Sequence, residues 1–256
     1  MSQSCYILKT RVDCTSYTDA CDRIQAWVEA GASGYVVAAN VHVVMTAYRD
    51  PLYQSILSHA ALVTPDGMPL VWGLRWLGVR DQNRVYGPDL MLAWCQRAAA
   101  LGLPLYLYGG TTARLDRLRT YLKQHFPELV ISGSQAPPFR ALSPAEEAID
   151  VQRIQQSGAR VVLVGLGCPK QEQWMYRQVN QVQAVMIGVG AAFDFFSGEV
   201  SQAPRWMMAL GLEWVYRLSQ EPGRLWRRYL INNPQFILLF GLQILGHRWR
   251  RLKFPD

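Results

Sequence analysis

The segment IGVGAAFDFFSGEVSQAPRWMMALGLEWVYRLSQEPGRLWRRY, residues 187–229, changes character halfway along its length. Its first residues are apolar and run into a glycine turn, as at the end of a buried strand, and Asp194 follows where that strand end would open onto a crevice. From residue 205 onward, arginines alternate with tryptophan and tyrosine, a pairing suited to anionic groups beside an apolar surface. We therefore predict an α/β domain over residues 1–200 and a basic, aromatic helical appendage over residues 201–256.

Short apolar runs recur upstream of this segment and alternate with helical patterns. Helices are predicted, for example, over residues 17–29 and over 145–156, where Ser143 and Pro144 mark the start. Strands are predicted at residues 5–9, 34–39, 61–63, 105–108, 129–132, 161–165 and 184–187. This alternation is typical of a Rossmann-like, mostly parallel sheet with helices on both faces.

Polar residues and glycines follow several of these strands. In a parallel sheet the carboxyl ends of the strands lie along one edge, where ligands bind, so we expect one crevice to collect these residues. They are Asn40, Asp66, Gly109, Gly110, Gly167, Gln171 and Asp194. Their convergence is the main argument, from the residues alone, for a single site.

Glycines between a strand and a helix allow backbone N–H groups to approach a phosphate or a nucleotide. Gly109 with Gly110, and the run GLGCPKQ at residues 165–171, have this arrangement. Neither is a dinucleotide fingerprint or a P-loop, and glycines often follow strands because the chain must turn. A dehydrogenase on a Rossmann-like sheet is therefore disfavoured, because it would need a dinucleotide fingerprint, although another nucleotide-dependent enzyme stays possible.

Three charged residues near these loops each allow a structural and a functional interpretation. Asp66 would project a carboxylate into the crevice, but Pro-Asp-Gly is also a common turn. Arg84 is on its own an ordinary loop arginine, and Asp194 fits a helix cap equally well.

No Asp-x-Asp pair occurs, and the histidines at positions 42, 59, 125 and 247 lack ligand spacing, so we predict no metal site and no cofactor.

The net charge of +7 is concentrated near the C-terminus, where residues 201–256 hold eight arginines and one lysine against three acidic residues. This asymmetry favours a phosphate-bearing substrate or an anionic membrane surface, although a solvated basic face is the simplest alternative. Nucleic acid is disfavoured because no recognition motif is present.

Five cysteines without a Cys-x-x-Cys pair indicate neither a disulfide framework nor a zinc site and fit a reducing cytoplasm.

Three separated motifs resemble the WecG/TagA/CpsF family of bacterial glycosyltransferases. They are TPDGMPLVW at residues 64–72, GLGCPKQEQW at 165–174 and APRWMMALGLEWVYRLSQEPGRLWRRYLINNPQFI at 203–237. The resemblance spans nearly the whole chain. It implies an inverting transfer from a UDP-linked sugar, of the N-acetylmannosamine type, to a polyprenyl-diphosphate-linked sugar in the synthesis of cell-surface polysaccharide.

The resemblance also implies roles for individual residues. Asp66 corresponds to the family's proposed catalytic base and Arg84 to its active-site arginine, while Asn40, Gln171 and Asp194 would shape the donor site. The family's C-terminal appendage is thought to fold over the active site and to bring arginines to the diphosphate, here Arg217, Arg224 and Arg227. These arginines would replace a metal ion, and self-association of the core, giving a homo-oligomer, would compete with closure of the appendage.

One position departs from the family pattern. Relatives often carry a hydroxyl-bearing run such as Thr-Pro-Asn, whereas this chain has Ala38-Ala39-Asn40. A contributing hydroxyl is therefore absent, which would fit a different donor sugar. It also leaves open a second class of function, a non-catalytic scaffold at the membrane surface with a vestigial nucleotide crevice.

The C-terminal stretch combines an apolar run at residues 236–245 with basic and aromatic residues further on. The run has about half the length that a membrane-spanning helix needs, and the N-terminus does not look like a secretory signal. We expect this tail to anchor the protein on anionic lipid at the cytoplasmic face of the plasma membrane. The alternative is a helix packed on its own domain or on another subunit.

Overall fold

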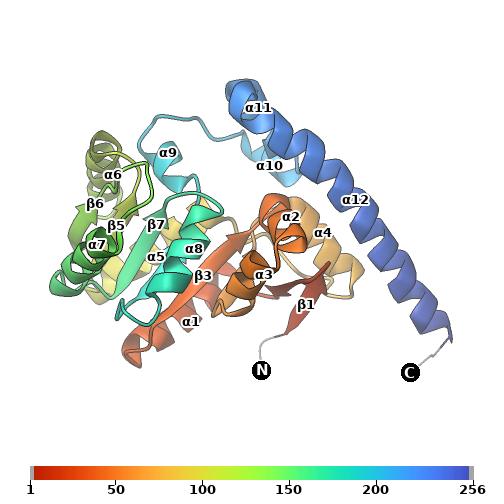
Figure 1. The fold of residues 1–256 in the computed structure, drawn as a ribbon, viewed down its shortest axis with the longest axis horizontal. Helices are drawn as coiled ribbons and strands as arrows, with labels where there is room; N and C mark the ends of the chain where they lie inside the picture. The colour runs from red at the N-terminus through yellow and green to blue at the C-terminus, as the bar shows by residue number, and fades with distance from the viewer. Residues whose placement is uncertain (1–2, 254–256) are drawn as a thin grey trace.

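The computed structural model describes the backbone of residues 3–253 and the side chains of residues 3–246. Its centre is a parallel six-stranded sheet with the strand order β4-β3-β8-β7-β5-β6 (Figure 1). The strands are β3 (Gly34–Ala39), β4 (Leu62–Pro65), β5 (Leu105–Gly109), β6 (Ile131–Gln135), β7 (Val161–Gly165) and β8 (Val185–Gly188). The predicted mostly parallel sheet is confirmed.

The first predicted strand lies outside this sheet. Residues Ser4–Ile7 form β1, which pairs antiparallel with β2 (Thr10–Asp13) in a separate two-stranded sheet. The side chain of Asp13 accepts a hydrogen bond from the backbone N–H of Val63 at 2.7 Å, so the hairpin covers the outer edge of β4. Covering an edge strand protects its unpaired backbone groups, which explains why this polar strand is buried.

Helices cover both faces of the sheet, as predicted, because alternate side chains of each strand point to opposite faces. Tyr35 and Val37 pack under one layer and Val36 under the other. The first layer contains α2 (Val41–Arg49), α3 (Pro51–Ser58), α4 (Met68–Trp76), α7 (Pro144–Gln156) and α8 (Lys170–Gln178). The second contains α1 (Tyr17–Glu29), α5 (Gly87–Leu101), α6 (Thr112–His125) and α9 (Ala192–Phe196).

The C-terminal segment is helical, with α10 (Arg205–Ala209), α11 (Glu213–Gln220) and α12 (Pro222–Lys253). Pro222 separates α11 from α12, as the sequence predicts, because proline lacks a backbone N–H and fits the first turn of a helix. A second proline, Pro234, lies inside α12. Phe236 and Phe240 of α12 are buried in the same core cluster as α2. Gln243 also binds Tyr6 and Leu8 beside β1, each at 2.7 Å. The α12 helix therefore packs on the α/β core (Figure 1), while the boundary at residue 200 stays a prediction.

The connections between strands open a crevice at the carboxyl edge of the sheet. The chain leaves β5 through α6 toward β6 at the outer edge, whereas it leaves β7 through α8 toward β8 on the other side. Neighbouring strands whose connections diverge in this way leave space between the loops that follow them. The loops after β5 and β7 are the two glycine-containing loops singled out in the sequence.

Candidate active site

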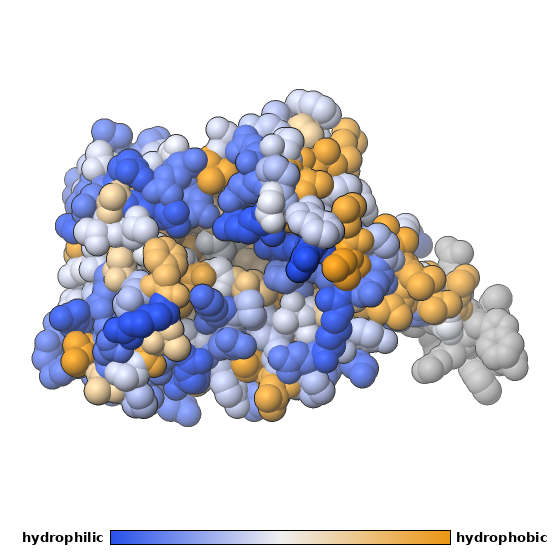
Figure 2. Space-filling model, turned by 45° about the horizontal axis from the view of Figure 1, so that its top comes forward, coloured by the Kyte–Doolittle hydropathy of each residue, from blue (hydrophilic) through white to orange (hydrophobic). Residues whose placement is uncertain are grey.

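A large cavity lies between the carboxyl ends of the strands and the C-terminal helices. It has a volume of about 1320 Å³, and the face on which it opens is hollowed near its centre (Figure 2). Strand-end residues Ala38, Asn40, Asp66 and Gly110 line it, and so do Glu213, Arg217 and Arg228 of the C-terminal helices. A cavity of this size exceeds what a drug-sized ligand fills, so it has room for two substrates.

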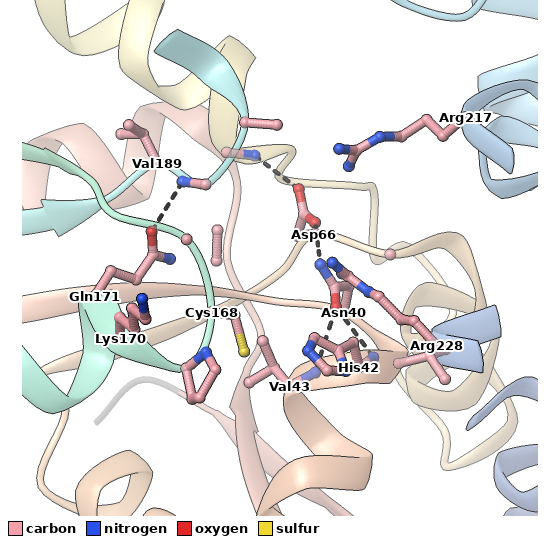
Figure 3. A pocket seen from close by; sticks show the side chains of 18 of the residues that line it. Asn40, His42, Val43, Asp66, Cys168, Lys170, Gln171, Val189, Arg217 and Arg228 are labelled. Carbon is pink, nitrogen blue, oxygen red and sulfur yellow. Dashed lines mark hydrogen bonds between the residues drawn. The ribbon is translucent and has the colours of Figure 1, made fainter. Parts of the chain in front are cut away.

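Asp66 follows β4 and is held from two sides. Its Oδ1 accepts a hydrogen bond from the backbone N–H of Gly87 at 2.8 Å, at the first residue of α5. Its Oδ2 accepts one from the side-chain amide of Asn40 at 3.3 Å (Figure 3). The carboxylate is buried, with only 8% of the residue exposed. Asp66 therefore has a fixed orientation at the wall of the cavity.

Burial raises the pKa of Asp66, because a charged carboxylate loses its hydration. Arg84 opposes this effect and Glu213 reinforces it, while the hydrogen bonds from Gly87 and Asn40 favour the ionised form. The pKa remains above the ordinary value of an aspartate. A carboxylate with a raised pKa is a stronger base, which suits proton abstraction from a hydroxyl group.

Arg84 lies beside Asp66 and joins the core to the C-terminal helices. Its Nε donates to the backbone carbonyl of Asp66, and its Nη2 lies 2.6 Å from Oε2 of Glu213. The guanidinium also lies over the ring of Tyr86, 4.0 Å from its centre. Neither Glu213 nor Tyr86 was identified from the sequence, although Glu213 is one of only three acidic residues in a strongly basic segment, a usable signal.

Asn40 has a structural task in addition to its contact with Asp66. Its side-chain oxygen accepts from the backbone N–H groups of His42 and Val43, which caps α2. His42 in turn lies with Nδ1 3.0 Å from the amide nitrogen of Asn232 on α12. Burial and two nearby arginines lower the pKa of His42 to about 3, so this histidine is neutral and joins α2 to α12.

The glycine loops serve different purposes. Gly110 and Gly167 line the cavity, both with positive φ, whereas Gly109 does not line it. A Cβ at Gly109 would lie 2.6 Å from the backbone of Gly165, so Gly109 is required for the close approach of the loops after β5 and β7. Gln171 is buried and accepts a hydrogen bond from the backbone N–H of Gly190 at 3.3 Å, which connects the loops after β7 and β8.

Asp194 lines the cavity near its cationic wall, in the first turn of α9. Its Oδ1 lies 2.5 Å from Nη1 of Arg114 on α6. Burial raises the pKa of Asp194, while Arg114, Arg224 and Arg217 act to lower it. This aspartate therefore stands beside the arginines rather than beside Asp66.

The structure separates the three predicted C-terminal arginines. Arg217 of α11 and Arg224 of α12 line the cavity. Arg227 does not line it: its side chain is exposed, and its guanidinium lies over the ring of Trp226. Its neighbour Arg228 takes that place, because residues four apart on a helix share a face and Arg224 sets the phase.

Arg228 has an unusual environment for a cation. Its Nε is buried without a hydrogen-bond partner, and among the described residues no carboxylate forms a salt bridge with it. Burial lowers its pKa, and Arg217 and Arg224 lower it further by charge repulsion. A half-buried cation with no counterion is unfavourable and leaves a strong site for an anionic ligand. In Figure 3, Arg217 and Arg228 reach in from the C-terminal helices toward Asp66 and Asn40.

Within the part of the chain that the structure describes, no group of three or more histidine, cysteine, aspartate or glutamate side chains is arranged to hold a metal ion. The polar groups in the cavity include the buried carboxylate of Asp66, which follows β4, and the guanidinium groups of the C-terminal helices. Such an arrangement can accept a proton at Asp66 and stabilise negative charge at Arg217, Arg224 and Arg228.

The chain is similar to known proteins over most of its length. The profile of the glycosyl transferase WecG/TagA/CpsF family matches residues 5–250. The chain is also similar to an N-acetylglucosaminyldiphosphoundecaprenol N-acetyl-beta-D-mannosaminyltransferase from Bacillus spizizenii, at 30% identity over 212 residues, which cover 82% of this chain and 80% of the relative. The chain belongs to the WecG/TagA/CpsF family of glycosyltransferases.

Proposed function

We propose that this glycosyltransferase moves a sugar of the N-acetylmannosamine type from a UDP-sugar to a polyprenyl-diphosphate-linked sugar, with inversion at the anomeric carbon. The name of the Bacillus relative supports the transferred sugar and the lipid-linked acceptor. The observation that carries the proposal is that Asp66, from the loop after β4, and the cations Arg217 and Arg228, from the C-terminal helices, line one cavity. The reaction needs a base for the acceptor and positive charge for the leaving group.

The proposed chemistry gives Asp66 and the arginines of the C-terminal helices different roles. The acceptor hydroxyl oxygen forms a bond to the anomeric carbon, and its proton passes to the carboxylate of Asp66. On the opposite face of the sugar the bond between that carbon and the diphosphate oxygen breaks. UDP leaves with the electron pair, and the guanidinium groups of Arg217, Arg224 and Arg228 stabilise its negative charge. These arginines would act in place of a divalent cation, as the missing Asp-x-Asp pair suggests.

The donor would lie along the glycine loops. Gly110 and Gly167 leave backbone groups accessible in the cavity, and Gln171 fixes the loops after β7 and β8 relative to each other. Ala38, which replaces the hydroxyl-bearing residue of relatives, lines the cavity close to Gly87. A methyl group at this position offers no hydrogen bond, which would alter the preference for the donor sugar.

A lipid-linked acceptor requires access to a membrane surface, and α12 has a suitable face. Phe236 and Phe240 pack on the core, whereas Leu238, Leu242 and Leu245 are exposed. Hydrophobic side chains gather along this helix in Figure 2. No helix among the described residues has the length and hydrophobicity to cross a membrane. We propose that the exposed face of α12 rests on the inner face of the plasma membrane. Of the basic tail, the side chains of residues 247–253 and all of Phe254 lie outside the described part.

Asp66→Asn should abolish the proposed base. We expect kcat to fall by roughly 100-fold or more, the usual contribution of general base catalysis. In the wild type, kcat/KM should rise with pH as Asp66 loses its proton, and this acid limb should lie above the ordinary aspartate range because burial raises the pKa. UDP release measured across pH tests both statements, with calorimetric UDP binding as the control for folding. An asparagine variant within tenfold of wild type would exclude Asp66 as the base.

Arg228→Ala and Arg227→Ala remove the same charge from adjacent positions of α12. In the presence of a chelator, Arg228→Ala should lower kcat/KM by roughly 100-fold, as expected for the loss of a group that stabilises transition-state charge. Arg227→Ala should stay within about fivefold, since exposed charges contribute up to about 1 kcal/mol. Equal losses in the two variants would contradict the assignment of Arg228.

Leu238→Ser combined with Leu242→Ser should weaken binding to anionic liposomes, because it removes apolar surface from the exposed face of α12. A matched control replaces Leu52 and Ile149, which are also exposed but lie on α3 and α7. Sedimentation with liposomes should show a loss of bound protein only for the α12 pair. Unchanged sedimentation of the α12 variant would refute this membrane-facing surface.

A further inference from the structure

Glu213 is an acidic residue in the basic C-terminal segment, and its side chain enters the active site. It is the first residue of α11. Its Oε2 lies 2.6 Å from Nη2 of Arg84, and its Oε1 accepts a hydrogen bond from the hydroxyl of Tyr86 at 3.0 Å. The side chains of Arg84 and Glu213 are each only 15% exposed. Both carboxylate oxygens of Glu213 are therefore used by the loop that precedes α5.

The contacts of Arg84 leave part of its guanidinium available. Its Nε is used by the carbonyl of Asp66 and one Nη2 hydrogen by Glu213, while the planar group lies over the ring of Tyr86. An arginine has five N–H donors in a fixed plane, so the remaining donors keep a defined direction. Glu213 thus fixes the orientation of Arg84 without occupying all of its hydrogen-bonding capacity.

Two simpler interpretations of Glu213 do not account for these contacts. An acidic residue in the first turn of a helix is favourable through the helix dipole alone, but it then remains in solvent. A mere tether between the C-terminal helices and the core is already supplied by Arg205 of the preceding helix α10, whose Nη1 lies 2.7 Å from Asp89 Oδ2 outside the cavity. The burial of Glu213 against two residues beside Asp66 indicates a role in the site itself.

We propose that Glu213 is a positioning residue of the transferase, which locks Arg84 and Tyr86 beside Asp66 when α11 packs on the core. Arg217 lies four residues later and enters the cavity from the same helix. Packing of α11 therefore completes the site in two ways, since it orients the core arginine and delivers a cation for the diphosphate. The kinetic consequences of this inference rest on the proposed function. The positioning of Arg84 and Tyr86 by Glu213 does not depend on it.

The charge of Glu213 also affects Asp66. The charged and titratable side chains that face Asp66 are Arg84, Glu213, Tyr86 and Tyr17. Arg84 lowers the pKa of Asp66 and Glu213 raises it. Removing the negative charge at position 213 should consequently lower the pKa of Asp66 and move the acid limb of kcat/KM to lower pH.

The test compares Glu213→Ala, Glu213→Gln and the matched control Arg205→Gln in the full chain. Glu213→Ala should lower kcat by up to roughly 100-fold, as expected when a catalytic arrangement is displaced by about 1 Å. Glu213→Gln preserves shape, so it should recover part of kcat while its acid limb shifts to lower pH. Arg205→Gln breaks the other tether and should retain the wild-type kcat and pH profile.

Amide hydrogen exchange measures the lock independently of catalysis. Glu213→Ala should speed exchange in residues 84–87 and in α11, whereas Arg205→Gln should leave residues 84–87 unchanged. Wild-type kinetics and exchange in both Glu213 variants, or the same changes in Arg205→Gln, would overturn the proposal. Hydrogen exchange is measured without substrates, so it tests the contact between Glu213 and Arg84 even if the chain shows no transfer with the chosen substrates. If the alanine variant fails to fold, Glu213→Gln provides the test.

Discussion

The site depends on one constraint, the fixed burial of the Asp66 carboxylate where β3, β4 and the first turn of α5 meet. The N–H of Gly87 and the amide of Asn40 hold its two oxygens. Burial raises its pKa, so the group is a stronger base than an exposed aspartate. Asn40 reaches Asp66 because the Asn40 side chain is held in place as the cap of α2. Gly87 reaches Asp66 because Gly87 is the first residue of α5. The fold therefore orients the proposed base through three separate connections.

The core alone provides only part of the site. The arginines proposed to bind the diphosphate belong to the C-terminal helices, and Glu213 of α11 completes the environment of Arg84. The same α12 that presents Arg224 and Arg228 to the cavity packs on the core through Phe236 and exposes leucines on its other side. Proposed catalysis and proposed membrane contact thus depend on different faces of one helix, an arrangement that would bring the reaction close to a lipid-linked substrate.

Much of this arrangement could be predicted from the sequence, because parallel strands place their carboxyl ends along one edge and because proline favours the first turn of a helix, where Pro222 lies. Other features needed the three-dimensional structure. The phase of α12 selects Arg228 over Arg227, and a difference of one residue cannot be predicted where two helices meet at an unknown angle. Gly109 looked like a ligand-binding glycine but is required for the approach of Gly165. Glu213 was overlooked because its partner Arg84 is 129 residues away.

The most direct test of the account is acceptor-dependent release of UDP by the full chain. The measurement combines UDP-N-acetylmannosamine and other UDP-sugars with a short polyprenyl-diphosphate-linked N-acetylglucosamine, in the presence of EDTA. The account predicts that one donor releases UDP only when the acceptor is present and that a disaccharide product appears on the lipid. UDP-sugar binding without transfer across the whole panel would contradict a catalytic role for the cavity and would favour a scaffold at the membrane surface.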